Sequence, residues 1–217
     1  MLRFAVLISL ACLGLVNGHG RLEEPPGRST MWRFGFKTEQ NPDDAELFCG
    51  GITRKGTINY KRLPSKEEKF QISHKLQTQC YFPFNNTDGG KYGKGVIART
   101  YKSGQTITAI TNIVANHFGW MEFKICPEEP GKTATQECLD QHPLQLADGS
   151  GTRYNLGSQR GPVKVQLKLP EGFKCDRCVF QWHWKCGNHW GICEDGKGRL
   201  GCGPQEYFRG CADIRIE

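Results

Sequence analysis

The stretch Val163-Lys164-Val165-Gln166-Leu167-Lys168-Leu169 alternates strictly between apolar and polar side chains. Such alternation is typical of a β-strand that turns one face to a protein core and the other to solvent. Outward from it, residues 106–110 are β-branched and alternating, residues 178–184 place their large aromatic side chains on one face, and residues 211–216 repeat the alternation near the end of the chain. These four stretches predict strands of an all-β fold.

The segments between the predicted strands are rich in turn residues. The chain holds 27 glycines, as short strands joined by frequent turns require. Pro25-Pro26-Gly27 predicts an extended, loop-rich amino-terminal region. Helical periodicity is scarce, and residues 66–76 predict one short helix, with Ser65 and Glu68 at capping-box spacing. We therefore predict a β-sandwich of antiparallel strands with long loops and short helices.

The amino terminus has the pattern of a secretory signal peptide. Arg3 supplies a positive charge, an apolar run from Phe4 to Val16 follows, and small residues precede a cut after Gly18. Such a cut makes His19 the first residue of the mature chain. We predict that residues 1–18 are a signal peptide and that residues 19–217 form one secreted, extracellular domain.

Length and charge limit the classes of partner. The mature chain would have 217 − 18 = 199 residues, which fits one domain with a real core. Its net charge falls from +7 to +6 because Arg3 is lost. We find no Lys/Arg cluster dense enough for nucleic acid, and no apolar run near the roughly 20 residues that cross a bilayer. Neither nucleic acid nor a membrane is expected as a partner, and a monomer is expected.

The cysteine count predicts a disulfide-rich domain. Cys12 leaves with the signal peptide, and an even number in an exported chain predicts a disulfide framework of five bridges whose connectivity stays open. Zinc is the alternative at the CxxC of Cys175 and Cys178, which a reducing compartment would favour. Asn85-Asn86-Thr87 is a glycosylation sequon that predicts a modified Asn85 in a loop. The ten cysteines are Cys49, Cys80, Cys126, Cys138, Cys175, Cys178, Cys186, Cys193, Cys202 and Cys211.

A mature amino-terminal histidine is a chelating group. The free α-amine and the ring Nδ1 of His19 could bind one metal ion together, and divalent copper prefers such nitrogen ligands in planar arrangements. One more imidazole would complete a plane of three nitrogens. His117 is the best candidate because it follows a predicted strand, and because small Ala115 and Gly119 would let the backbone approach a metal.

The remaining histidines have more ordinary interpretations. His183 lies between Trp182 and Trp184, where a structural histidine is expected. His189 stands in a turn-like stretch flanked by cysteines, which favours a surface or hydrogen-bonding role. His74 and His142 are expected to be exposed.

Several of these segments, taken in order, resemble the animal-type lytic polysaccharide monooxygenases (auxiliary activity family fifteen). The resemblance covers essentially the whole mature chain, and no one of the motifs is specific alone. The segments that carry it are the mature His19-Gly20, Met31–Phe36, Phe48–Gly51, Ala115–Gly119, Phe180–Trp184 with Cys186-Gly187-Asn188, and Cys202–Ile214.

The resemblance implies an immunoglobulin/fibronectin-III-like β-sandwich with a copper site made by His19 and His117. It places an aromatic residue axial to copper, three residues before the cysteine of the last strand, which is Phe208 here. Many relatives have tyrosine there, so a local bulge that brings in Tyr207 is the alternative. Glu206 matches a polar position beyond the copper ligands that would hydrogen-bond an oxygen species bound to copper, the alternative being an ordinary surface carboxylate. Ala115 matches a small residue that shapes access to copper.

The resemblance also implies the reaction. The chain would be a copper-dependent monooxygenase that oxidatively cleaves glycosidic bonds of an insoluble polysaccharide, chitin first and cellulose second. An external small-molecule or protein electron donor and O₂ or H₂O₂ would be needed, and C1 and C4 oxidation stay open. The alternatives are a non-catalytic polysaccharide-binding protein and a secreted copper-binding protein. Trp182, Trp184 and Trp190 could carry electrons, although core packing is the preferred interpretation.

Overall fold

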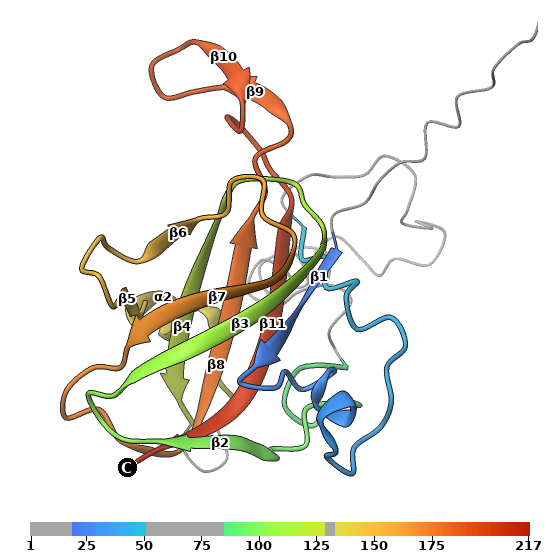
Figure 1. Cartoon of the computed structure of the whole chain (residues 1–217), viewed down its shortest axis with the longest axis vertical. Coiled ribbons are helices and arrows are strands. Elements are labelled where there is room, and N and C mark those ends of the chain that lie inside the picture. The colour runs from blue at the N-terminus through green and yellow to red at the C-terminus, as the bar shows by residue number, and fades with distance from the viewer. Residues whose placement is uncertain (1–18, 51–84, 129–132) are drawn as a thin grey trace, which may run out of the picture.

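Two sheets packed face to face form the body of the protein in the computed structural model, which describes residues 19–50, 85–128 and 133–217 (Figure 1). In the first sheet the strand order is β1 (His19–Glu24), β3 (Thr106–Ala115), β7 (Gly161–Lys168) and β5 (Gln145–Leu146). In the second it is β2 (Ile97–Tyr101), β11 (Tyr207–Ile216), β8 (Cys175–Lys185), β4 (Trp120–Pro127) and β6 (Arg153–Asn155). Every pair is antiparallel except β2 with β11. The β-sandwich prediction is confirmed.

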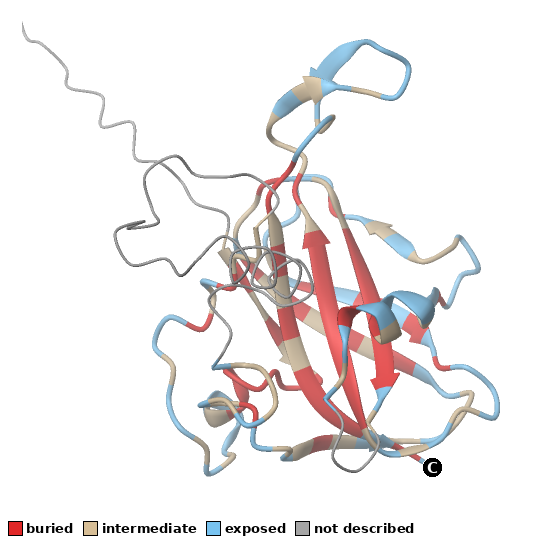
Figure 2. Ribbon diagram, turned by 180° about the vertical axis from the view of Figure 1, so that it is seen from behind, coloured by how far each residue is buried: buried red, intermediate tan, exposed pale blue. Residues whose placement is uncertain are grey.

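The four predicted strands lie within β7, β3, β8 and β11. Their alternating faces form the core, because Val163, Val165 and Leu167 are buried while the residues between them are exposed. On β8, Phe180, Trp182 and Trp184 are fully buried between the sheets, and Figure 2 shows this continuous buried layer. The predicted helix over residues 66–76 lies outside the described residues. Short helices occur instead at η1 (Met31–Phe34) and α2 (Gln136–Gln141).

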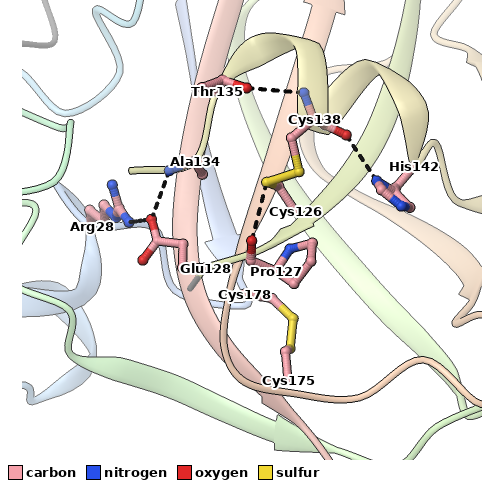
Figure 3. Close-up of a disulfide and its surroundings, with 10 residues drawn as sticks. All are labelled: Arg28, Cys126, Pro127, Glu128, Ala134, Thr135, Cys138, His142, Cys175 and Cys178. Atoms are coloured by element: carbon pink, nitrogen blue, oxygen red, sulfur yellow. Dashed lines mark hydrogen bonds and ion pairs between the residues drawn. A yellow bond between two sulfur atoms is a disulfide. The ribbon is translucent and has the colours of Figure 1, made fainter. Parts of the chain in front are cut away.

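The described disulfides close local loops. Cys126 pairs with Cys138, which ties β4 to the start of α2, where Thr135 caps the helix by accepting from the Cys138 backbone N–H (Figure 3). Cys193 pairs with Cys202, and Cys49 is also disulfide-bonded. Cys175 pairs with Cys178, so the zinc alternative at this CxxC is wrong.

The expectation of five bridges is wrong for Cys186 and Cys211, which are free thiols. Cys211 on β11 lies opposite Gln181, whereas Cys186 is five residues further along the β8 segment. Five residues of extended chain span roughly 16 Å, and a disulfide needs Cα atoms within about 7 Å. The two thiols therefore cannot reach each other. Cys80 lies outside the described residues.

One end of the sandwich gathers the ends of several strands. β3 ends there, β4 starts there, β8 ends there and β11 starts there, and the hairpin of β9 (Trp190–Ile192) and β10 (Gly198–Leu200) projects beyond them (Figure 1). We refer to this as the hairpin end. Among the described residues, no helix has the length and apolar character needed to cross a membrane.

Candidate metal centre

His19 begins β1 at the hairpin end. It pairs with Ala115 of β3, and the antiparallel direction carries its backbone nitrogen past Ala115 towards Asn116 and His117. The His19 Nε2 atom lies 3.6 Å from Glu46 Oε1. In a chain that starts at His19, the amine and Nδ1 are joined through Cα, Cβ and Cγ, so together they could close a six-membered chelate ring on one metal ion.

The loop of residues 116–119 holds His117 in place. Asn116 ties the loop down, because its side chain donates to the carbonyls of Gly157 and Gln159 and accepts from the Phe118 N–H. The His117 carbonyl accepts from the Gly187 N–H at 2.8 Å. All of these hydrogen bonds involve backbone or side-chain amide groups. They fix the position of the loop backbone from which the His117 side chain extends.

Gly119 allows this loop to lie close against the end of β8. Its φ is 78°, and a Cβ there would overlap the carbonyl oxygen of Lys185. Glycine is therefore required so that the loop can lie against the end of β8.

His117 and Glu206 form a buried pair. The Nδ1 atom of His117 lies 3.1 Å from Glu206 Oε2, and the exposed fractions of the two residues are 7% and 5%. A carboxylate on Nδ1 fixes the ring orientation and leaves Nε2 as the nitrogen for a metal. Glu206 is thus no ordinary surface carboxylate, and its backbone lies just before β11.

Phe208 and Tyr207 point to opposite faces of β11. Phe208 is 1% exposed and packs against Trp184 with ring centroids 5.2 Å apart, and Trp184 in turn contacts the His117 ring at 6.4 Å. Tyr207 instead stacks on His183 at 5.2 Å. Phe208 therefore shares the face of His117, and Tyr207 lies on the other face.

His183 is a structural histidine, as predicted. Its Nδ1 accepts a hydrogen bond from Arg209 Nε at 2.9 Å, which requires a neutral ring. Burial, with nearby Arg209 and Lys124, holds the pKa of His183 well below its usual value. His142 was expected to be exposed but is half-buried, because its Nδ1 bonds the Cys138 carbonyl and its ring contacts Phe173. His74 lies outside the described residues.

The structure adds residues that sequence reasoning missed. Cys186 was assigned to a disulfide, yet its Sγ lies within 4.8 Å of ligand atoms of both His117 and Glu206. Burial and the Glu206 charge raise the pKa of this thiol. His189 was expected to have a surface or hydrogen-bonding role, and its side chain is 42% exposed with Nε2 4.0 Å from Glu206 Oε2; its approach to Glu206 was not expected. No spacing signal identifies either residue, because both approach Glu206 only through the turn after β8.

Gln205 holds that turn in place. It is fully buried, accepts from the His189 N–H and donates to the carbonyls of His189 and Cys202. It was not among the expected site residues.

Core packing is the confirmed role for two of the three tryptophans. Trp182 and Trp184 are fully buried and stacked, with ring centroids 6.1 Å apart. Trp190 is different, because it is 66% exposed on the hairpin, and its ring lies over Gly198, where a Cβ would collide with it. The expectation that Trp190 packs in the core is therefore wrong.

The donors at the hairpin end fit copper. The Nδ1 of His19, the Nε2 of His117 and, in a chain that starts at His19, the amine of that residue would be nitrogen ligands of the kind that Cu(II) prefers. His19 begins β1 opposite Ala115 of β3, and His117 lies two residues beyond Ala115 in the loop that follows β3. Beyond these donors, the Glu206 carboxylate contacts the His117 ring and the aromatic side chain of Phe208 is buried. The carboxylate fixes the orientation of the His117 ring.

Comparison with known proteins agrees with this chemistry. A family profile described as "Lytic polysaccharide mono-oxygenase, cellulose-degrading" matches residues 19–214. The chain is 40% identical to the solved structure of a lytic polysaccharide monooxygenase AA15 from Thermobia domestica in the Cu(I) state, with a TM-score of 0.75 over 91% of this chain and 98% of that chain.

A more distant structure is a chitin binding domain from Burkholderia pseudomallei, at 13% identity and a TM-score of 0.49 over 93% of this chain and 100% of that one. That likeness is too low to carry an argument. No curated protein matches the sequence.

Proposed function

This chain belongs to the lytic polysaccharide mono-oxygenase family and is a copper-dependent oxidoreductase acting on polysaccharide, and from this premise we propose which residues carry the reaction and on which polymer. The observation that carries the proposal is the pairing of His19 with Ala115, which directs the His19 backbone nitrogen towards His117.

Removal of residues 1–18 creates the site. The His19 nitrogen is an amide while Gly18 is attached, and becomes a metal-binding amine only after cleavage. The match to the family begins at His19, which supports a mature start at this residue. The protein would then be secreted, with Asn85 exposed in a turn where a glycan can be attached, and it would act as a monomer outside the cell.

The geometry supports a role for each residue of the proposed centre. His19 supplies its amine and Nδ1, and His117 supplies Nε2 because its Nδ1 is committed to Glu206. Phe208 packs on Trp184, which contacts the His117 ring, and this supports Phe208 rather than Tyr207 as the aromatic residue of the centre. Its phenyl ring would offer copper no donor atom. Glu206 orients His117 and offers a carboxylate at the same place. Ala115 keeps the approach beside His19 open.

When bound, copper supplies one-electron chemistry with O₂ or H₂O₂ at the expense of an external electron donor. The protein holds the ligand nitrogens still, keeps the His117 ring in one tautomer and presents the site to a surface. A site at the end of a sandwich suits an insoluble substrate, because a polymer in a crystal cannot enter a pocket.

The projecting hairpin supplies a docking face for the polymer. Trp190, Ile192 and Leu200 are 66%, 56% and 69% exposed, and the register of β9 with β10 places them on one face. Exposed apolar side chains of this kind stack on the apolar faces of sugar rings. We take chitin as the first substrate and cellulose as the second.

The test is product analysis with each polymer. The mature protein starting at His19 is loaded with one equivalent of copper and incubated with β-chitin or cellulose, with and without ascorbate. We expect ascorbate-dependent aldonic acids or 4-keto sugars from β-chitin by mass spectrometry. Oxidised products from cellulose alone would overturn the choice of polymer. Tight copper binding without oxidised products from either polymer would leave copper handling as the function.

A further inference from the structure

We propose that Phe118 positions the substrate: its phenyl ring stacks on the apolar face of a sugar ring of the polymer, beside the proposed ligand His117. This contact rests on the proposed function, which supplies the nature of the polymer. Phe118 combines two features that are rarely found in one residue, a left-handed backbone and an exposed apolar side chain.

The backbone of Phe118 is held in a conformation that a large side chain rarely adopts. Its φ is 55°, and among the described residues it is the one non-glycine residue with a positive φ. Left-handed backbone favours glycine and, less often, asparagine or aspartate, because a Cβ crowds the neighbouring carbonyl. The chain therefore carries phenylalanine at a position where a smaller residue would fold more easily.

Hydrogen bonds on both sides of the residue hold this conformation. The Phe118 N–H donates to Asn116 Oδ1, and the Phe118 carbonyl accepts from the indole N–H of Trp184 at 2.7 Å. Trp184 is fully buried, so it ties the loop to the core. Neither hydrogen bond uses the phenyl ring, so they require the backbone of this residue and not its side chain.

The phenyl ring of Phe118 faces solvent at the hairpin end. Phe118 is 51% exposed. Within the described part of the chain it is neither one of the buried core side chains nor one of the half-buried side chains that pack against them. Both the backbone conformation and the exposure of an apolar ring are unfavourable for folding. Strained residues of this kind gather at functional sites, which indicates a role for the ring outside the fold.

The backbone of Phe118 connects the candidate centre to the base of the hairpin. The residue directly follows His117. The turn after β8 lies against the same loop, since a Cβ at Gly187 would be 2.9 Å from the Gly119 nitrogen and 3.8 Å from the Phe118 carbonyl carbon. A Cβ at Gly201, which follows β10, would be 3.4 Å from the Gly187 carbonyl oxygen. The ring therefore continues the proposed docking face of the hairpin towards the metal ligands.

The chemistry of this segment selects a neutral partner. Residues 114–119 contain no lysine, arginine, aspartate or glutamate. Their exposed side chains are Val114 and Phe118, each 51% exposed. An uncharged aromatic ring stacks on the apolar C–H face of a sugar and offers nothing to an acidic or basic group. Chitin and cellulose are both neutral polymers with such faces, so the contact serves either of them and fixes how the chain lies beside His117.

The test removes the ring and keeps the backbone. Asparagine tolerates a left-handed φ, so the Tm of metal-free Phe118→Asn should equal or exceed that of the wild type. Its binding to β-chitin and to cellulose in sedimentation isotherms should weaken roughly two- to tenfold, the range for one aromatic contact. Cu(II) affinity by calorimetry should stay unchanged. Phe118→Tyr retains a ring and should bind as the wild type does. Phe34→Asn makes the same replacement at an exposed phenylalanine of η1 and should also bind normally.

Wild-type isotherms in Phe118→Asn would overturn the proposal and leave the proposed function intact. A lower Tm in Phe118→Asn would also overturn it, because the ring would then belong to the fold. A wild-type dimer that Phe118→Asn abolishes, with unchanged isotherms, would assign the ring to a contact between two copies of the chain. The isotherms need neither copper nor a reductant, so a failure of the oxidative cleavage test is distinguishable from a failure of this one.

Discussion

At the scale of single residues, Glu206 connects the side chains of the candidate centre. Its Oε2 lies 3.1 Å from His117 Nδ1 and 4.0 Å from His189 Nε2. A carboxylate on the remote nitrogen of a ligand imidazole raises its basicity and fixes its orientation. In Glu206→Gln, we expect the affinity of the mature protein for Cu(II) to fall about 10–100-fold by calorimetry.

Glu46→Gln is the matched control for this change. Glu46 also approaches a ligand histidine, but its side chain is 65% exposed and 3.6 Å from His19 Nε2. Exposed ion pairs contribute about 0–1 kcal/mol, so Cu(II) affinity should change no more than a few-fold. Equal losses in both variants would show that the buried carboxylate has no special role.

His183 predicts a pH dependence of stability. Burial and neighbouring cations lower its folded-state pKa well below 6.5, so the unfolded chain binds the proton more readily. The free energy of unfolding should therefore fall as pH drops below 6.5. His183→Asn retains an acceptor for Arg209 but cannot be protonated in this range. When the pH is lowered from 8 to 5, we expect the Tm of the wild type to fall more than the Tm of His183→Asn.

At the scale of elements, the loop between β3 and β4 determines where His117 lies. In Gly119→Ala the added Cβ would overlap the Lys185 carbonyl at a φ of 78°. We expect a loss of about 3 kcal/mol or more in the free energy of unfolding measured with urea. Gly172→Ala has a similar φ of 75° but nothing within 4 Å of the new Cβ, so it should lose only about 1–2 kcal/mol. Similar losses would mean that the close approach to β8 is not needed.

The hairpin of β9 and β10 predicts a separation of substrate binding from metal binding. Trp190 is exposed and makes up part of the apolar face, so Trp190→Ala should weaken binding to β-chitin roughly two- to tenfold in sedimentation isotherms. Copper affinity should stay unchanged. Phe34→Ala, which removes another exposed aromatic side chain from η1, should bind β-chitin normally. A normal isotherm for Trp190→Ala would remove the hairpin from the docking face.

At the scale of the whole molecule, the alternating stretches were sufficient to predict the sandwich, because a period of two and a buried face define a strand locally. Cys186 and Cys211 could not be recognised as free thiols, because pairing depends on positions along β8 and β11 that no spacing records. His189 and Cys186 reach Glu206 only through a turn held by Gln205. The two candidate ligand histidines could be proposed because one stands at a predicted cleavage point and the other follows a strand.

The proposed start at His19 gives the last prediction, which depends on the proposed removal of residues 1–18 and on the pairing of β1 with β3. One extra residue before His19 turns its amine into an amide and removes both the amine and the chelate it forms with Nδ1, while the β1–β3 pairing can persist. Cu(II) affinity by calorimetry should therefore fall further than in any single-residue variant above, with Tm of the metal-free protein unchanged. An extra residue after Glu217, at the far end of β11 from the centre, is the matched control and should bind Cu(II) normally. Undiminished Cu(II) affinity in the amino-terminally extended chain would refute the assignment of His19, because no donor of the proposed centre would then depend on its free amine.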